Sequence, residues 1–120
     1  MILKIKEVAV LNAELELLLT EPEVSFSTKY DLVKLLEKTR KINEAYMSTR
    51  IAIFKKYGKK LENEDAYTIN GQEESVIAKA QDELSIIADK EENFTDSFKI
   101  NEFADIKSKN PYFYIYKFIE

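Results

Sequence analysis

The residues of this chain that could do chemistry are ten lysines and arginines gathered between Lys29 and Lys60. Three acidic residues lie among them, so the stretch carries a net charge of +7, whereas eight basic and nineteen acidic residues give the rest of the chain −11. Clustered cations release counterions from a phosphate backbone, so this stretch is a candidate for nucleic-acid binding. The candidate basic face comprises Lys34, Lys38, Lys41, Lys55 and Lys56.

Two properties of the whole chain argue against nucleic acid as the partner. The net charge of −4 and the pI near 5.1 repel a polyanion at long range. Arginine, which grips phosphate with two parallel hydrogen bonds, supplies only Arg40 and Arg50 of the eighteen basic residues. The alternative is that the basic stretch packs beside acidic helices or presents a solvated outer face.

The C-terminal residues form a second candidate site. Five of the seven residues from Tyr112 to Phe118 are aromatic. Tyrosine is enriched in protein interfaces because it combines a large rigid ring with a polar tip. The candidate interaction surface comprises Tyr112, Tyr114, Tyr116 and Phe118. In the alternative interpretation these rings complete the core of a small domain.

Histidine and cysteine are both absent from the sequence. Histidine is the commonest general base near neutral pH and the commonest metal ligand, and cysteine supplies thiol nucleophiles and thiolate sites. The acidic run at residues 62–65 lacks the glycine and glutamate register of a calcium loop. We therefore predict no enzyme, with no catalytic, cofactor-binding or metal-ligating residues and no evident small-molecule substrate.

The elements that position these candidates are marked by four chain breakers. Pro22, Gly58, Gly71 and Pro111 are the only prolines and glycines, and the 35 residues between the first two are uninterrupted. Apolar residues recur in that interval at close to helical spacing. The sequence predicts one continuous helix over at least residues 30–55, about 45 Å long if it extends to thirty residues.

Helix-end signals frame this prediction. A short strand at residues 3–5 and a helix over residues 7–19 precede it, ended by Pro22. Ser25 or Ser27 is the expected N-cap of the long helix. Gly58 is expected to end it as a left-handed cap. Part of so long a helix is expected to stand free or to pack on a second copy, because a compact chain of this size has a radius of gyration of about 14 Å.

The second half of the chain is predicted from shorter patterns. Residues 59–71 indicate a loop or small β-arm, and Asn70 with Glu73 is typical of a capping box that opens a third helix. This helix is expected to fray near Asn93, and its apolar residues are Val76, Ile77, Ala80, Leu84, Ile87 and Ala88. Residues 98–100 alternate as a strand that could pair with the N-terminal one. Asn101 is expected to cap a helical turn, and Asn110 followed by Pro111 favours a short C-terminal helix, with a strand as the alternative.

These elements predict a mainly α protein with a minor β part. Three helices are arranged around one long central helix, with a small two-stranded β element and a short C-terminal helix, in a single domain of residues 1–120. The expected core includes five residues, each on the apolar face of its element. These residues are Leu15, Leu36, Tyr46, Leu84 and Phe98.

No run of 18 apolar residues occurs, so no membrane span is predicted. The first residues lack the basic, apolar and small-residue segments of a secretory signal. We therefore expect the protein in the cytoplasm of a cell or infected host, or in a virion.

The order of these elements resembles small proteins of tailed phages and prophages whose function is unknown. The resemblance is carried by the strand, the leucine-rich helix, the long helix ending in Lys55, Lys56, Tyr57 and Gly58, the third helix and the closing strand at residues 98–100. The aromatic C-terminus departs from that pattern. The resemblance implies phage origin and supplies no catalytic motif.

Three functions remain open on the sequence alone. The first is a phage protein that acts by binding protein, as a virion component or assembly factor, and either a partner or a second copy would cover its surplus apolar surface. The second is an inhibitor of a host enzyme or defence complex, whose acidic surface mimics nucleic acid. The third is nucleic-acid binding through the basic stretch of the long helix.

Overall fold

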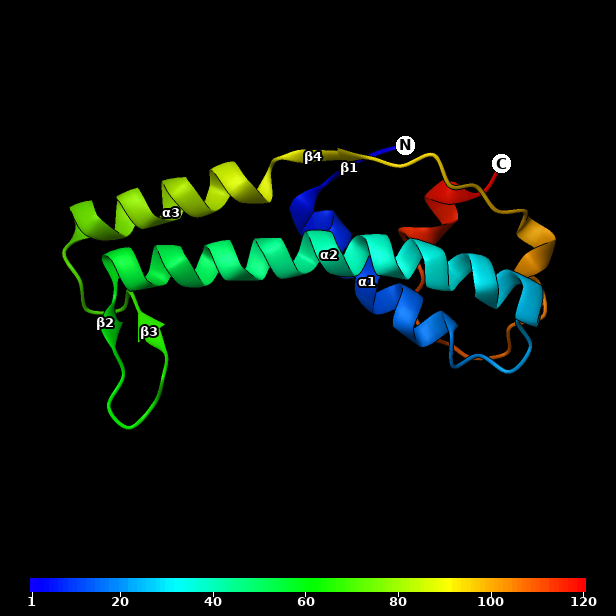
Figure 1. Ribbon diagram of the computed structural model, residues 1–120, viewed down its shortest axis with the longest axis horizontal. Helices are drawn as coiled ribbons and strands as arrows, with labels where there is room; N and C mark the ends of the chain where they lie inside the picture. The colour runs from blue at the N-terminus through cyan, green and yellow to red at the C-terminus, as the bar shows by residue number, and fades with distance from the viewer.

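The long central helix determines the shape of the molecule. In the computed structural model, which describes residues 1–120, α2 (Phe26–Tyr57) is an unbroken helix of 32 residues along the longest axis (Figure 1). The molecule measures 52 × 30 × 22 Å, and its Cα radius of gyration of 17.8 Å exceeds the roughly 14 Å of a compact chain of this length. The predicted continuous helix over residues 30–55 is confirmed.

The start of α2 agrees with the sequence prediction, but its end has a different geometry. Ser25 is the N-cap, and its Oγ accepts the backbone N–H of Thr28 at 3.1 Å. Gly58 ends the helix with φ −98° and ψ 179°, so the predicted left-handed cap is wrong. Glycine is needed here for space, because a Cβ would lie 2.5 Å from the carbonyl oxygen of Phe54 and 2.6 Å from that of Thr68.

Nearly all close packing lies at one end of the molecule, which we term the head (residues 1–42 and 90–120). There α1 (Ile5–Leu18) packs against the first half of α2. The buried cluster of fourteen apolar residues lies entirely in the head, and it includes three of the predicted core residues. The burial of Leu15, Leu36 and Phe98 is confirmed.

A small antiparallel sheet joins the two sequence segments that make up the head. The sequence predicts its first strand, but the prediction of its second strand is wrong. β1 (Ile2–Lys4) pairs with β4 (Glu91–Asn93), with Leu3 opposite Glu92, rather than with residues 98–100. The sequence of β4 has low strand propensity. Its position is fixed instead by α3, which returns the chain to the N-terminus, and by the burial of Phe94 directly after it.

The rest of the molecule is a thin extension, which we term the arm (residues 43–89). It comprises the second half of α2, a hairpin of β2 (Lys59–Lys60) and β3 (Tyr67–Thr68), and α3 (Glu74–Ala88), which lies back along α2 (Figure 1). The predicted small β-arm is confirmed. The predicted capping box at Asn70 is wrong, because the N-cap of α3 is Glu73. Asn70 lies instead in the preceding turn, next to Gly71, whose φ is +82°.

The arm has almost no core of its own. Ile53 and Ala80 are its buried residues. Tyr46 and Leu84, both predicted to be core residues, are half-buried. The physical reason is that a single helix covers α2 here, whereas α1 and the C-terminal residues together enclose it in the head.

The C-terminal segment (residues 98–120) folds back over the head. It forms two short 3-10 helices, Ile100–Glu102 and Ile115–Phe118, with a turn and irregular chain between them. Lys99, and not Asn101, precedes the first one. The second is the predicted short C-terminal helix, but it begins four residues after Pro111. The start of this segment pairs with its end, since the N–H of Phe98 donates to the carbonyl of Phe118 at 2.8 Å.

Candidate docking surface

Two buried glutamates of the N-terminal region hold the C-terminal segment. Glu14 on α1 accepts the backbone N–H groups of Phe113, Tyr114 and Ile115 at 2.9, 3.1 and 3.2 Å. These are N–H groups at the start of a 3-10 helix, which the carboxylate caps in place of a local side chain. The carboxylate therefore explains why the helix begins here and not at Pro111.

Glu21, about one turn beyond the end of α1, also holds the C-terminal segment by accepting hydrogen bonds from it. Its Oε1 accepts the hydroxyl of Ser108, the side-chain amide of Asn110 at 2.9 Å and the hydroxyl of Tyr112 at 2.7 Å. These hydrogen bonds, led by that of Ser108, hold the pKa of Glu21 below its ordinary value of 4.5. Burial, and then the bond to Glu21, raise the pKa of Tyr112 to about 12.

The four predicted interaction residues of the C-terminal segment do not form one exposed surface. Phe118 is buried in the head core, where its ring meets that of Phe94 edge-on at 5.7 Å. Tyr112 is bonded to Glu21 and half-buried, and Tyr114 is half-buried. Tyr116 is exposed. Placing Phe118 on an interaction surface was therefore wrong, because its ring completes the core.

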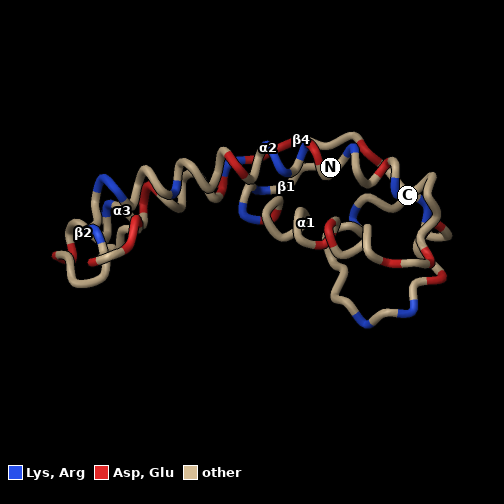
Figure 2. The backbone as a smooth tube through the Cα atoms, turned by 60° about the horizontal axis from the view of Figure 1, so that its bottom comes forward, with Lys and Arg blue, Asp and Glu red and all other residues tan.

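The predicted basic face is divided into two groups by the length of α2. Lys34, Lys38 and Lys41 lie at the head, about 20 Å along the helix from Lys55 and Lys56. Lys38 donates to the carbonyl of Asn93 at 3.1 Å, and Lys56 pairs with Glu83 at 3.3 Å. Basic and acidic residues both occur along the length of the molecule, and Figure 2 shows no uninterrupted basic track.

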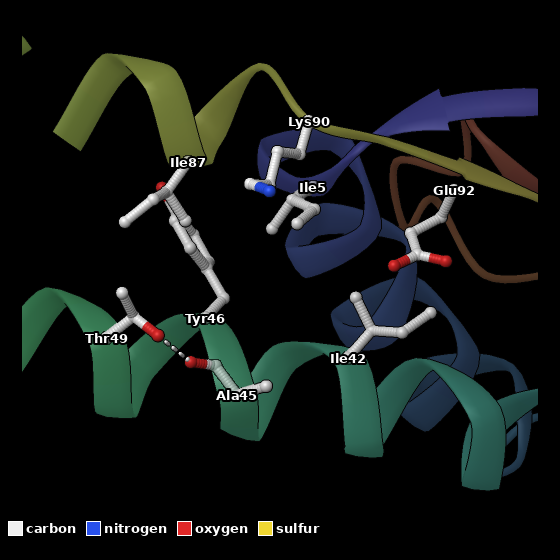
Figure 3. Close-up of a pocket in the computed structure, with 8 residues that line it drawn as sticks. All are labelled: Ile5, Ile42, Ala45, Tyr46, Thr49, Ile87, Lys90 and Glu92. Atoms are coloured by element: carbon white, nitrogen blue, oxygen red, sulfur yellow. Dashed lines mark hydrogen bonds between the residues drawn. The ribbon is translucent and has the colours of Figure 1, made fainter. Parts of the chain in front are cut away.

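One open groove lies where head and arm meet. An open groove of about 220 Å³ is bordered by Ile5, Ile42, Tyr46 and Ile87, and Tyr46 rises from α2 toward Ile87 of α3 (Figure 3). Pockets that enclose a small molecule usually measure about 300–1,000 Å³. This groove is smaller than that range, and we interpret it as the junction between head and arm.

A further candidate surface is an exposed row of residues on α2. The sequence predicts surplus apolar surface on the long helix, but it does not single out these residues. Starting at Phe26, residues separated alternately by four and three positions form a row along α2 whose members are mostly exposed, with Arg40 in its middle reaching Glu16 of α1. We term this row the seam. Its members are Phe26, Tyr30, Val33, Glu37, Arg40, Glu44, Met47, Ile51 and Phe54. All are exposed except Phe54, which is half-buried.

The spacing of the seam is that of the a and d positions of a heptad, the row through which one helix packs on another. Apolar side chains occupy both ends, and Glu37, Arg40 and Glu44 occupy the middle. At the arm end, Ile51 and Phe54 border a second groove with Ala66 and Tyr67 of the hairpin. The seam therefore presents a row with helix-packing spacing that is exposed from Phe26 to Ile51.

The e and g positions beside the seam carry only basic charges. These charged residues are Lys29, Lys34, Lys41, Arg50 and Lys55, and none of them makes an ion pair or a side-chain hydrogen bond. The Lys29 and Lys34 ammonium groups lie 5.7 and 5.6 Å from the ring centroids of Phe26 and Tyr30. Cations thus border the apolar rings of the seam directly.

The signal for the seam is present in the sequence as the unbroken alternation of four and three from Phe26 to Phe54. It is obscured because buried residues of α2, such as Leu32 and Leu35, follow a stronger helical period on another side of the helix. A signal for Glu14 is also present, since it lies between Leu11 and Leu18 on the inward stripe of α1.

No group of histidine, cysteine, aspartate or glutamate residues is arranged to hold a metal ion. No helix is both long enough and apolar enough to span a bilayer. In comparisons with known proteins, no family model, curated protein or solved structure matches this chain.

Proposed function

We propose that the protein acts without catalysis, by binding another protein through the seam of α2. The observation that carries this proposal is the exposure of the a/d row from Phe26 to Ile51 on a 32-residue helix, with Ile51 55% and Tyr30 65% exposed. Soluble monomers rarely leave apolar patches larger than a few hundred Å² in contact with water, and such patches usually mark interaction sites.

The thin arm supports the same proposal. Its α3 covers one side of α2 and leaves Met47 and Ile51 exposed on another. A surface that the fold does not use for its own packing is available for a partner, and the arm extends it well beyond the head. The C-terminal segment is a weaker candidate because Glu14 and Glu21 hold it against the head.

We further propose that this binding serves a tailed-phage particle, as a virion component or as an assembly factor. Support comes from the order of the strand and the three helices and from the helix ending at Lys55, Lys56, Tyr57 and Gly58, while the closing strand of that pattern lies at residues 91–93 and not at 98–100. Identification of the protein by mass spectrometry in purified particles of its source would support a virion role. Its presence in infected cells but not in particles would favour an assembly factor.

A photo-crosslinking experiment tests the seam as the binding site. A photoreactive phenylalanine replaces Tyr30 in one variant and Phe113 in another, since their side chains are 65% and 64% exposed but lie on α2 and on the C-terminal segment. After irradiation in cells, we expect a discrete cross-linked product from position 30 and little from position 113. The reverse result would place the interface on the C-terminal segment and contradict the proposal.

A further inference from the structure

We propose that the partner covering the seam is an acidic amphipathic helix of a different protein, and not a second copy of this chain. This inference rests on the proposed function and adds the chemistry of the partner. In paired helices, the charged e and g residues beside the apolar row select which partner is accepted. All five charged residues in these positions of α2 are basic.

These flanking cations are available to a partner. The basic groups elsewhere on α2 are engaged, since Arg40 pairs with Glu16 at 3.6 Å and Lys56 with Glu83 at 3.3 Å. Lys41 and Lys55 are exposed and make no ion pair. A helix with glutamate or aspartate beside its apolar row would supply the missing carboxylates.

Pairing with a second copy would bring like charges together in either direction. An antiparallel pair places Lys41 opposite Lys41 of the second copy and Lys29 opposite its Arg50, although Glu37 then faces Arg40. A parallel pair places Lys29 opposite Lys34, Arg50 opposite Lys55, and Glu37 opposite itself. In both arrangements, repulsion between like charges at the e and g positions destabilises the pair. An acidic partner helix avoids this repulsion.

The seam also discriminates against other polyanions. Glu37 and Glu44 lie within the row itself, where they would face a phosphate backbone or an anionic bilayer directly. A partner helix meets each of them with a single side chain, which can be basic. The aliphatic residues Val33, Met47 and Ile51 need apolar contact that nucleic acid does not provide.

Two further groups of carboxylates limit where the partner lies. Asp65 of the hairpin borders the groove beside Ile51 and Phe54, so we place the acidic helix over the seam from Phe26 to Ile51. Asp31 and Asp96 lie near Lys34 in a shallow pocket and reduce the positive charge there. Lys41 is therefore the cation on which the selection of the partner depends most.

Two designed peptides test the inference on the full chain. Both have four heptads with the same a and d positions, leucine opposite the apolar ends of the seam, lysine opposite Glu37 and Glu44 and glutamate opposite Arg40. They differ only in carrying glutamate or lysine at every e and g position. Titration followed by circular dichroism and calorimetry is expected to show that the glutamate peptide binds at least about tenfold more tightly than the lysine peptide, and that added salt weakens it.

Substitutions in the chain assign this binding to the seam and its flanks. Ile51→Glu is expected to abolish binding, whereas Ile100→Glu, at a residue of similar exposure in the head, is expected to leave it unchanged. Lys34→Glu with Lys41→Glu is expected to lower the affinity for the glutamate peptide about tenfold. The pair Lys107→Glu and Lys109→Glu makes the same change in net charge away from the seam and serves as its control.

The possible outcomes separate this inference from the proposed function. Equal binding of both peptides, lost in Ile51→Glu, would overturn the acidic-partner inference and leave the seam as a docking surface. A stable dimer in light scattering, also lost in Ile51→Glu, would do the same. Binding of neither peptide, or seam-dependent binding of a single-stranded oligonucleotide or of phosphatidylserine vesicles in their place, would contradict both.

Discussion

At the scale of single residues, carboxylates in the interior determine how the chain is closed. Burying an ionised carboxylate is costly unless hydrogen bonds satisfy it. Glu14 meets this condition with three backbone N–H groups, and Glu21 meets it with three side-chain donors. Both therefore join the region around α1 to residues about ninety to a hundred positions later in the chain.

The Glu21 contacts predict a specific pH dependence of stability. Because the pKa of Glu21 is lowered in the folded chain, its contribution is fully present above its ordinary pKa of 4.5 and is lost as pH falls through the lower folded value. Thermal unfolding of the parent chain and of Glu21→Gln should therefore differ most above pH 4.5 and converge below it. Glu64→Gln on the exposed hairpin loop is the control, and an equal effect of both changes at every pH would contradict the assignment.

Gly58 provides a steric prediction at the end of α2. In Gly58→Ala the added Cβ would clash with two backbone carbonyls, so the hairpin must move away from the helix end, at a cost of about 1–3 kcal/mol. Gly71→Asn is the comparison, because nothing lies within 4 Å of that position and asparagine tolerates its positive φ. Chemical denaturation of both variants measures the difference, and an unaffected Gly58→Ala chain would disprove the close approach.

At the scale of elements, the sequence predicts best those helices and strands whose bounds depend on nearby residues. The long helix follows from a 35-residue interval without breakers and from the cap at Ser25, and it forms as expected. The strand at residues 91–93 has no local signal, because its place depends on where α3 returns the chain. The same holds for the 3-10 helix at residues 115–118, which depends on Glu14 of a distant element.

The contrast between head and arm predicts unequal effects of two similar truncations. Leu36→Ala removes a buried side chain from the head core and should lower the free energy of unfolding by about 2–5 kcal/mol. Leu84→Ala removes a half-buried side chain from the arm, where water already reaches it, and should cost clearly less. Urea denaturation tests both. A loss at Leu84 as large as that at Leu36 would show that the arm is packed as tightly as the head.

At the scale of the whole molecule, one part of the fold provides most of the stability, and another part exposes the proposed docking surface. The head holds the fourteen-residue apolar cluster, and the arm carries α2 outward with one face uncovered. The predicted interaction surface at residues 112–118 is largely used by the head itself. The seam could have been found from its heptad spacing, but its exposure depends on which side of α2 the other elements cover, and that is a property of the complete fold.

The most direct measurement of the central claim is the accessibility of the seam to a thiol reagent. The chain contains no cysteine, so a single introduced thiol reports on one position. Ile51→Cys probes the seam, and Ile100→Cys is the matched control, because the two isoleucines are 55% and 59% exposed. In the purified chain both thiols should react with a maleimide at similar rates. In the cells or particles where the protein acts, Ile51→Cys should be protected while Ile100→Cys stays reactive, and equal labelling of the two positions there would contradict the claim that α2 is the docking surface.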